Sequence, residues 1–208
     1  MAQLDTKTKI IKSAEELFAI DGFHHTTLRA ITAKAGVNLA AVNYHFGSKE
    51  ALLEAIFDRH LLPLNNIRIK RMQAVADQAE KSGKKPNVEE VLRCFTEPTL
   101  ALLHRDSGTG HFRMLVGRSL SDPDQTVRQL FLKRVRGVIE LLVDLLCKAL
   151  PHRSREDVAL KLQFSLGAMS HTLTFQNQGL ILGSVDKSKS IGEVIEMLTD
   201  FIVKGMEG

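Results

Sequence analysis

The sequence has few cysteines, almost no aromatic residues other than phenylalanine, and no long apolar run. Its 208 residues include two cysteines, one tyrosine and no tryptophan. Cys94 and Cys147 lie far apart and match no metal-ligand spacing, so we expect two packed thiols in a reduced compartment. The absence of a run of about 18 apolar residues argues against a membrane-spanning helix. The first residues carry no apolar stretch behind a basic start, so we expect no secretory signal and a cytoplasmic location.

A second absence concerns acidic residues. No Asp or Glu occurs from Gly22 to Lys49, although Arg29, Lys34 and Lys49 in this stretch are basic. Acidic residues lie directly before and after the stretch. A surface without carboxylates can approach a polyanion without like-charge repulsion, which fits a nucleic-acid contact.

The net charge of +4 arises elsewhere in the chain, because its whole excess falls in residues 61–86. Residues 1–60 and 87–208 are each net neutral. The simplest interpretation of the basic stretch is the solvated face of a helix, and its charges could also add weak attraction to phosphates. Its six bases are Arg68, Lys70, Arg71, Lys81, Lys84 and Lys85.

The sequence does contain helical periodicity and helix-capping residues along most of its length. No segment shows sustained alternation with a period of two, so we predict an all-α chain of about nine or ten helices. Pro63 is expected to kink or break a helix that begins at Lys49, and Pro98 to interrupt a later one. Asp122 followed by Pro123 should open a further long helix.

Residues 27–46 predict a helix-turn-helix, with two short helices joined by Gly36-Val37-Asn38. On a wheel of 100° per residue, the second helix directs Leu39, Val42 and Phe46 inward. Its outward and flanking positions hold Ala40, Ala41, Asn43, Tyr44 and His45. Small alanines let such a helix lie close to base edges in the major groove. Phosphates would be bound by Thr27, Tyr44 and Lys49, and base edges by Arg29 and Asn43.

Several motifs in about residues 7–60 make this pattern more specific. They are Ala14-Glu15-Glu16-Leu17-Phe18, Gly22-Phe23, Thr26-Thr27-Leu28-Arg29-Ala30-Ile31, Ala35-Gly36-Val37, Val42-Asn43-Tyr44-His45-Phe46 and Ser48-Lys49-Glu50-Ala51-Leu52. Together they resemble the N-terminal domain of the TetR family of transcriptional regulators. The resemblance implies a DNA-binding domain at residues 1–50. A helix from Lys49 would link it to a larger helical domain at residues 51–208, which binds a small effector and dimerises.

By position, the resemblance implies that DNA is contacted by Thr27, Arg29, Asn38, Ala40, Ala41, Asn43, Tyr44, His45 and Lys49. Asn43 stands where many family members carry an aromatic or small residue, which predicts a distinct operator preference through an adenine contact. The stretch from Gly36 to Tyr44 also resembles a subgroup that includes fatty-acid-responsive regulators of lipid breakdown. An effector that is apolar or derived from a fatty acid would fit that subgroup.

The last two long helices, at about residues 155–177 and 190–203, are the pair through which the family usually dimerises. Their apolar stripes could build a four-helix bundle across a two-fold axis, or could pack only inside the monomer. The predicted interface residues are Leu162, Leu166, Met169, Leu173, Ile195, Leu198 and Ile202.

An effector pocket is expected between Phe95 and Phe175, with basic residues to meet an acidic head group. The predicted ligand residues are His104, Phe112, Arg113, Met114, Arg118, Met169, His171 and Phe175. Met and Phe stripes at helical spacing are more often core, and His171 on an apolar helix is more readily explained as a satisfied core histidine than as a ligand residue. We expect no cofactor and no metal ion.

These observations predict a homodimeric, ligand-responsive repressor that binds a near-palindromic operator through the major groove and is released by a small effector. Two alternatives remain open, an activator or dual regulator on the same fold and a helical ligand-binding protein without DNA binding. An enzyme is disfavoured, because Gly117-Arg118-Ser119-Leu120-Ser121 lacks the second glycine of a nucleophile elbow and follows no predicted strand.

Overall fold

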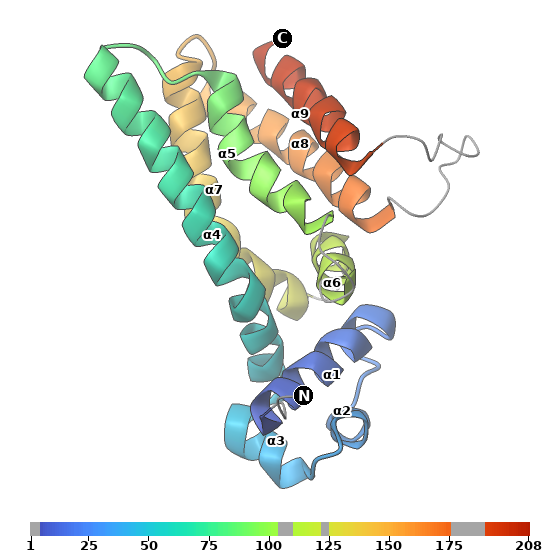
Figure 1. The fold of residues 1–208 in the computed structure, drawn as a ribbon. Helices are drawn as coiled ribbons and strands as arrows, with labels where there is room; N and C mark the ends of the chain where they lie inside the picture. The colour runs from blue at the N-terminus through green and yellow to red at the C-terminus, as the bar shows by residue number, and fades with distance from the viewer. Residues whose placement is uncertain (1–4, 104–109, 122–124, 176–189) are drawn as a thin grey trace, which may run out of the picture. The chain divides into compact units, whose positions relative to one another are not determined.

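The structure is a computed structural model that describes residues 5–103, 110–121, 125–175 and 190–208. These residues form nine α-helices, one short 3-10 helix and no strand (Figure 1), which confirms the predicted all-α fold. The helices are α1 (Thr6–Ile20), α2 (Leu28–Ala35), α3 (Leu39–Phe46), α4 (Lys49–Ser82), α5 (Val88–Leu100), η1 (Ala101–Leu103), α6 (Gly110–Ser121), α7 (Gln125–Ala149), α8 (Arg155–Phe175) and α9 (Ile191–Glu207).

Side-chain caps explain where several helices begin. Thr27, Asn38 and Ser48 each accept a hydrogen bond from the backbone N–H three residues further on, at 3.1, 2.8 and 3.0 Å. Asn87 and Ser190 do the same for α5 and α9. Such a bond satisfies one of the N–H groups that the first turn of a helix leaves unpaired. The predicted start at Asp122 and Pro123 lies outside the described residues.

Pro63 and Pro98 were expected to interrupt helices, but neither helix ends at its proline. Pro63 lies inside α4, and Pro98 lies inside α5. A proline in a helix removes one backbone N–H and crowds the preceding turn. In α4 the side chains of Leu61 and Leu64, on either side of Pro63, are buried, and that packing outweighs the local penalty. The expected break is therefore wrong, and α4 continues for 34 residues.

The chain divides into two compact units. The first unit comprises residues 1–62 and 107–134, and so includes α1, α2, α3, the beginning of α4, α6 and the beginning of α7. Ile10, Phe18, Ile31, Val42 and Phe57 form its core without any exposed surface. The predicted division at residues 50 and 51 concerns function rather than packing, and it stays a prediction.

Within the first unit, polar contacts join α4 to α1 and to α7. His60 Nε2 lies 2.9 Å from Glu15 Oε2, and the His60 ring stacks on Phe112 of α6 with 4.1 Å between ring centres. Arg134 of α7 donates to Asp58 at 2.8 Å and to Glu54 at 2.9 Å. These contacts fix the first part of α4 within the unit that contains the helix-turn-helix.

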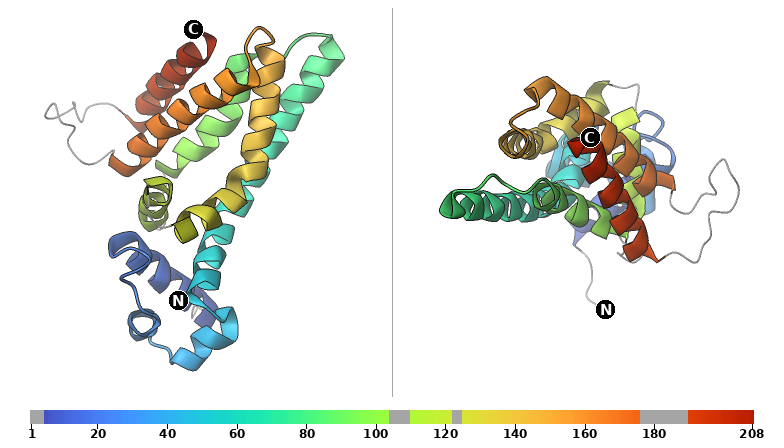
Figure 2. Two further views of the ribbon diagram at one scale, coloured as in Figure 1. Left: turned by 180° about the vertical axis from the view of Figure 1, so that it is seen from behind. Right: turned by 90° about the horizontal axis from the view of Figure 1, so that it is seen from above.

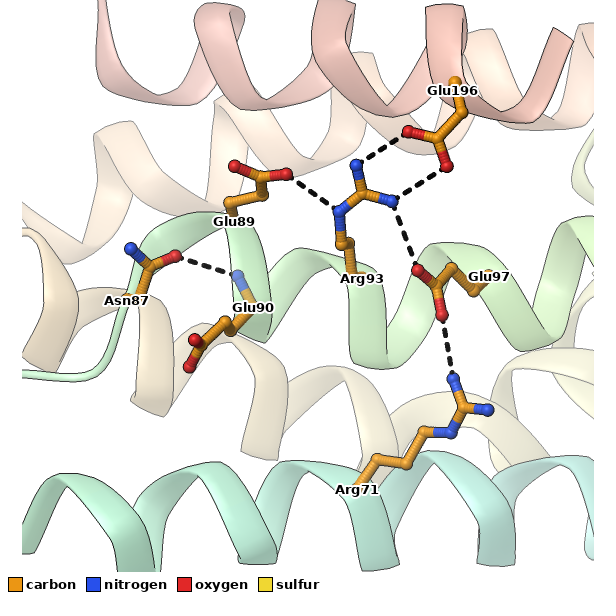
Figure 3. A network of polar contacts seen from close by, with 7 residues as sticks. All are labelled: Arg71, Asn87, Glu89, Glu90, Arg93, Glu97 and Glu196. Atoms are coloured by element: carbon orange, nitrogen blue, oxygen red, sulfur yellow. Dashed lines mark hydrogen bonds and ion pairs between the residues drawn. The ribbon is translucent and has the colours of Figure 1, made fainter. Parts of the chain in front are cut away.

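The second unit comprises residues 63–106 and 135–208, and its helices pack side by side (Figures 1 and 2). α9 packs on α5 and on α8. Figure 3 shows a chain of charges that connects three of these helices. Arg93 of α5 binds Glu196 of α9 at 2.8 Å and shares Glu97 with Arg71 of α4. Because these side chains are substantially exposed, each ion pair contributes little stability.

None of the helices in the described part of the chain combines the length and the apolar character that a membrane crossing requires. Both cysteines are free thiols. Cys94 is buried in α5, and burial raises its pKa.

Candidate nucleic-acid interface

The turn between α2 and α3 is closed by a glycine in the left-handed region. Gly36 has φ +66°, a conformation that a side chain would strain. Its N–H donates to the Ala33 carbonyl, and the N–H of Val37 donates to the Thr32 carbonyl. Asn38 then caps α3. The structure therefore confirms the predicted helix-turn-helix.

The third helix presents an exposed face that carries no acidic side chain. Ala40, Asn43 and Tyr44 are exposed, and Tyr44 has 86% of its surface accessible. On the opposite side, Val42 is fully buried. This face is the one that the helical wheel directed outward, and it is suited to enter a groove because its alanines are short and its polar groups can form hydrogen bonds.

Leu39 departs from the prediction that it packs inward. It is 40% exposed, whereas Val42 is buried and Phe46 is partly buried. A helical wheel gives the direction of a side chain and not how far the neighbouring helices extend. The wheel therefore predicts the burial of Val42 but not the exposure of Leu39, which lies at the end of the apolar stripe.

Lys49, a predicted phosphate contact, also forms hydrogen bonds within the protein. Its ammonium donates to the carbonyl oxygens of Phe23 and Thr26, at 2.9 and 3.1 Å, and lies 4.3 Å from the centre of the Phe23 ring. An ammonium carries three N–H donors, so one remains for a phosphate. Lys49 thus connects the start of α4 to the segment that precedes α2.

The remaining predicted DNA contacts lie at the two helix starts and at the end of α3. Thr27 caps α2 through its oxygen, which leaves its O–H able to donate, and Arg29 is exposed on the first turn of α2. Asn38 uses its carbonyl oxygen as a cap. The ring of His45 meets the ring of Tyr44 edge-on, with 5.1 Å between centres. The structure places these residues around α2 and α3, and their contacts with DNA stay a prediction.

Comparison with known protein families fits this geometry. A model described as bacterial regulatory proteins of the tetR family matches residues 10–56. A second model, described as a tetracyclin repressor-like C-terminal domain, matches residues 93–205 and so covers more than half of the chain. The chain belongs to the TetR family. The resemblance inferred from the N-terminal motifs is confirmed.

Curated relatives match this TetR-family chain over its N-terminal part. It is 39% identical over 51 residues to the HTH-type transcriptional regulator UidR of Escherichia coli strain K12, which is 24% of this chain and 26% of UidR. It is 38% identical over 60 residues to the HTH-type transcriptional regulator SrpR of Pseudomonas putida, which is 29% of this chain and 28% of SrpR. The chain thus spans about a quarter of the length of these curated relatives.

Solved structures match the TetR-family fold over nearly the whole chain. The fatty acid degradation regulator FadR from Bacillus halodurans has a TM-score of 0.69 at 16% identity, and the match covers 99% of this chain and 98% of that one. FadR from Bacillus subtilis in complex with stearoyl-CoA has a TM-score of 0.62 at 20% identity, covering 95% and 98%. At these identities the likeness establishes the fold alone.

The predicted ligand residues fall in both units. Phe112 is buried in the first unit, next to the partly buried Arg113 and Met114, and Met169 is buried in the second. His171 is exposed on α8, so the preferred interpretation of this residue as a core histidine is wrong. His104 and the side chains of Arg118 and Phe175 lie outside the described part of the structure. Within the described residues, no group of His, Cys, Asp and Glu side chains could hold a metal ion.

The predicted dimer residues of α8 and α9 mostly face the core of the chain itself. Leu162, Met169, Leu173 and Ile202 are buried, and the other three, Leu166, Ile195 and Leu198, are partly buried. Sequence reasoning missed four large apolar side chains that these helices expose, namely Leu160, Phe164, Met197 and Phe201. Their spacings of four residues, 160–164 and 197–201, were visible in the sequence as a second apolar stripe on each helix.

Proposed function

We propose that this TetR-family protein is a homodimeric, ligand-responsive transcriptional repressor that reads a near-palindromic operator with its two α3 helices. The observation that carries the proposal is the exposed, acid-free face of α3, where Ala40, Asn43 and Tyr44 project from a helix held by Gly36 and Asn38. Two such helices would enter successive major grooves about 34–36 Å apart. The match to the tetR-family N-terminal model supports DNA as the partner.

The exposed apolar side chains of α8 and α9 support a homodimer. Leu160 and Phe164 on α8, and Met197 and Phe201 on α9, are 48–66% exposed in the single chain, and the two helices pack against each other. Large apolar side chains gathered on neighbouring helices usually mark a surface that is covered by a partner. A second copy would cover them by pairing α8 and α9 across a two-fold axis into a four-helix bundle.

We further propose that an effector, apolar or derived from a fatty acid, binds the larger domain and releases the operator. The likeness to two FadR structures, one determined with stearoyl-CoA, supports this class of ligand. α4 is the proposed lever, because this single helix belongs to both compact units. A coupling free energy of about 1–3 kcal/mol between effector and operator would suffice.

Selection from a random duplex library tests the proposed DNA binding. We expect the purified protein to enrich one motif with two related half-sites whose centres are about 10 base pairs apart. Tyr44→Ala should retain less DNA of every sequence, whereas Gln78→Ala, at an exposed position on α4, should behave like the wild type. Failure to enrich any motif would reject the proposal. A reporter gene placed behind the selected operator then separates a repressor from an activator, because only a repressor lowers expression.

A further inference from the structure

Arg68 differs from the other bases of residues 61–86. Five of the six are exposed, as expected for a solvated helix face, but Arg68 on α4 is only 3% exposed and the expectation is wrong for it. Its Nη1 donates to Asn65 Oδ1 at 2.7 Å and its Nη2 to Thr99 Oγ1 at 2.6 Å. Its guanidinium carbon lies 4.2 Å from the centre of the Phe95 ring. All four residues belong to the second unit.

These contacts leave the charge of Arg68 unpaired. Asn65 and Thr99 are neutral, and no carboxylate in the described part of the chain forms an ion pair with Arg68. The buried Nε has no hydrogen-bond partner among the described residues. The two hydrogen bonds use two of the five N–H donors of a guanidinium. Burial lowers the pKa of Arg68 to about 9, so the group is still charged at pH 7.

A buried cation without an acid is costly, and proteins keep arginine out of the interior unless it is paired. We propose that Arg68 anchors a carboxylate-binding site at the contact of α4 and α5, and that the ligand is a carboxylate whose remainder is apolar. The identification of this ligand as the effector rests on the proposed function. The binding of a carboxylate at Arg68 does not depend on that function.

The chemistry of the site favours a carboxylate. The planar guanidinium forms paired, charge-assisted hydrogen bonds with carboxylate oxygens, and Nε together with the remaining Nη hydrogens supplies the donors. Leu64, Met72, Leu92 and Phe95 are buried on the same two helices, which fits an apolar remainder. Arg68 is the one buried Lys or Arg among the described residues, so its single charge matches a monoanion better than a phosphate of about two charges.

Calorimetric titration of the full-length protein with matched acids and amides tests the proposal. The probes are octanoate with octanamide and 3-phenylpropanoate with its amide, because each amide keeps the shape and removes the charge. We expect the wild type to bind each acid roughly tenfold to hundredfold more tightly than its amide. Arg68→Met should abolish this preference. Arg71→Met, three residues along α4 and exposed, is the matched control and should retain it.

Several results would overturn the site. They are equal binding of acid and amide by the wild type, no binding of either, or an undiminished preference in Arg68→Met. Circular dichroism checks folding. If Arg68→Met does not fold, Arg68→Lys replaces it, because lysine keeps the charge and lacks the planar pair of N–H donors of the guanidinium. An undiminished preference for the acid in Arg68→Lys also counts against the site. The site would also be overturned if octanoyl-CoA bound the wild type more tightly than octanoate does and bound Arg68→Met with the same affinity as the wild type. The ligand would then be a thioester that does not need Arg68.

The same preparations separate this inference from the proposed function. Operator binding by the wild type, combined with no acid preference, would reject the Arg68 site and leave the regulator intact. Acid preference that depends on Arg68, combined with no specific DNA binding, would reject the regulator and leave the site.

Discussion

Lys49 shows how one side chain can stabilise the segment that carries two predicted DNA contacts. Its ammonium satisfies two backbone carbonyls, those of Phe23 and Thr26, and sits over the Phe23 ring. Both carbonyls belong to the segment that leads into α2, which carries Thr27 and Arg29. The position of these two predicted DNA contacts therefore depends on Lys49.

Lys49→Met should lower the free energy of unfolding by about 1–2 kcal/mol, because two carbonyls lose a charged donor. Thermal unfolding measures this change, with Lys34→Met as the control. Lys34 pairs with Glu16 at an exposed site, and its loss should change stability by less than about 1 kcal/mol. Equal effects of the two substitutions would show that the Lys49 contacts do not hold the unit together.

Asn43 and Tyr44 are neighbours on α3 and should nevertheless differ in their effect on DNA binding. Asn43→Ala should reduce the preference for one base pair by about 1–3 kcal/mol, because an amide reads base edges. Tyr44→Phe removes a hydroxyl that we assign to a phosphate, so it should weaken binding to all sequences alike. Anisotropy titrations on duplexes with single base substitutions measure both effects. A uniform loss in Asn43→Ala would contradict its role in base reading.

For single residues, the helix caps could be predicted from the sequence, but the burial of individual side chains could not. The caps at Thr27, Asn38 and Ser48 follow from residue type and the next three positions, which the sequence displays directly. The burial of Arg68 and the exposure of Leu39 depend on which distant helices reach them. No local pattern contains that information.

At the scale of helices, the ion pairs of Arg134 with two carboxylates of α4 are the main polar link between α4 and α7 in the first unit. The Arg134 side chain is 10% exposed, and its guanidinium binds both Asp58 and Glu54. Its hydrogen bond to Glu54 lowers the pKa of that carboxyl below the ordinary value of 4.5. A carboxyl with a lowered pKa stabilises the folded state above its unfolded pKa and loses this contribution as the pH falls through its folded pKa.

Arg134→Met should therefore destabilise the protein by about 1–3 kcal/mol at pH 7. The difference from the wild type should stay constant down to about pH 5 and shrink below pH 4.5, as Glu54 takes up a proton. Chemical denaturation at a series of pH values measures it. A difference that grows as the pH falls would contradict the sign of this linkage.

The existence of each helix was predictable, and the course of α4 was not. Periodicity of apolar residues and caps indicated all the α-helices that the structure describes, but not the short 3-10 helix η1. Pro63 predicts a kink or a break, because the penalty for a proline inside a helix is local and visible in the sequence. The burial of Leu61 and Leu64, which outweighs this penalty, depends on tertiary packing that the local sequence does not show.

At the scale of the whole molecule, the proposed function requires a dimer that forms through α8 and α9. Sequence periodicity gave each helix more than one apolar stripe and could not tell which stripe the chain itself covers. The structure buries Leu162 and Ile202 and exposes Phe164 and Phe201. The exposed pair is therefore the better candidate for the contact with a second copy.

Phe164→Glu and Phe201→Glu should each convert the dimer into monomers, because a charge would be buried in the proposed interface. Size-exclusion chromatography with light scattering measures the mass. Ile67→Glu is the matched control, since Ile67 is also a large exposed apolar residue but lies on α4. A wild type that is monomeric at micromolar concentration, or variants that remain dimeric, would reject the interface.

The most direct test of the central claim is the affinity of the wild-type protein for its selected operator and for a scrambled duplex of the same composition, at one physiological salt concentration. Fluorescence anisotropy measures both dissociation constants. Specific DNA-binding proteins prefer their sites by roughly a thousandfold or more, and we predict a ratio of that size here. Equal affinity for the two duplexes would contradict sequence-specific DNA binding by this protein.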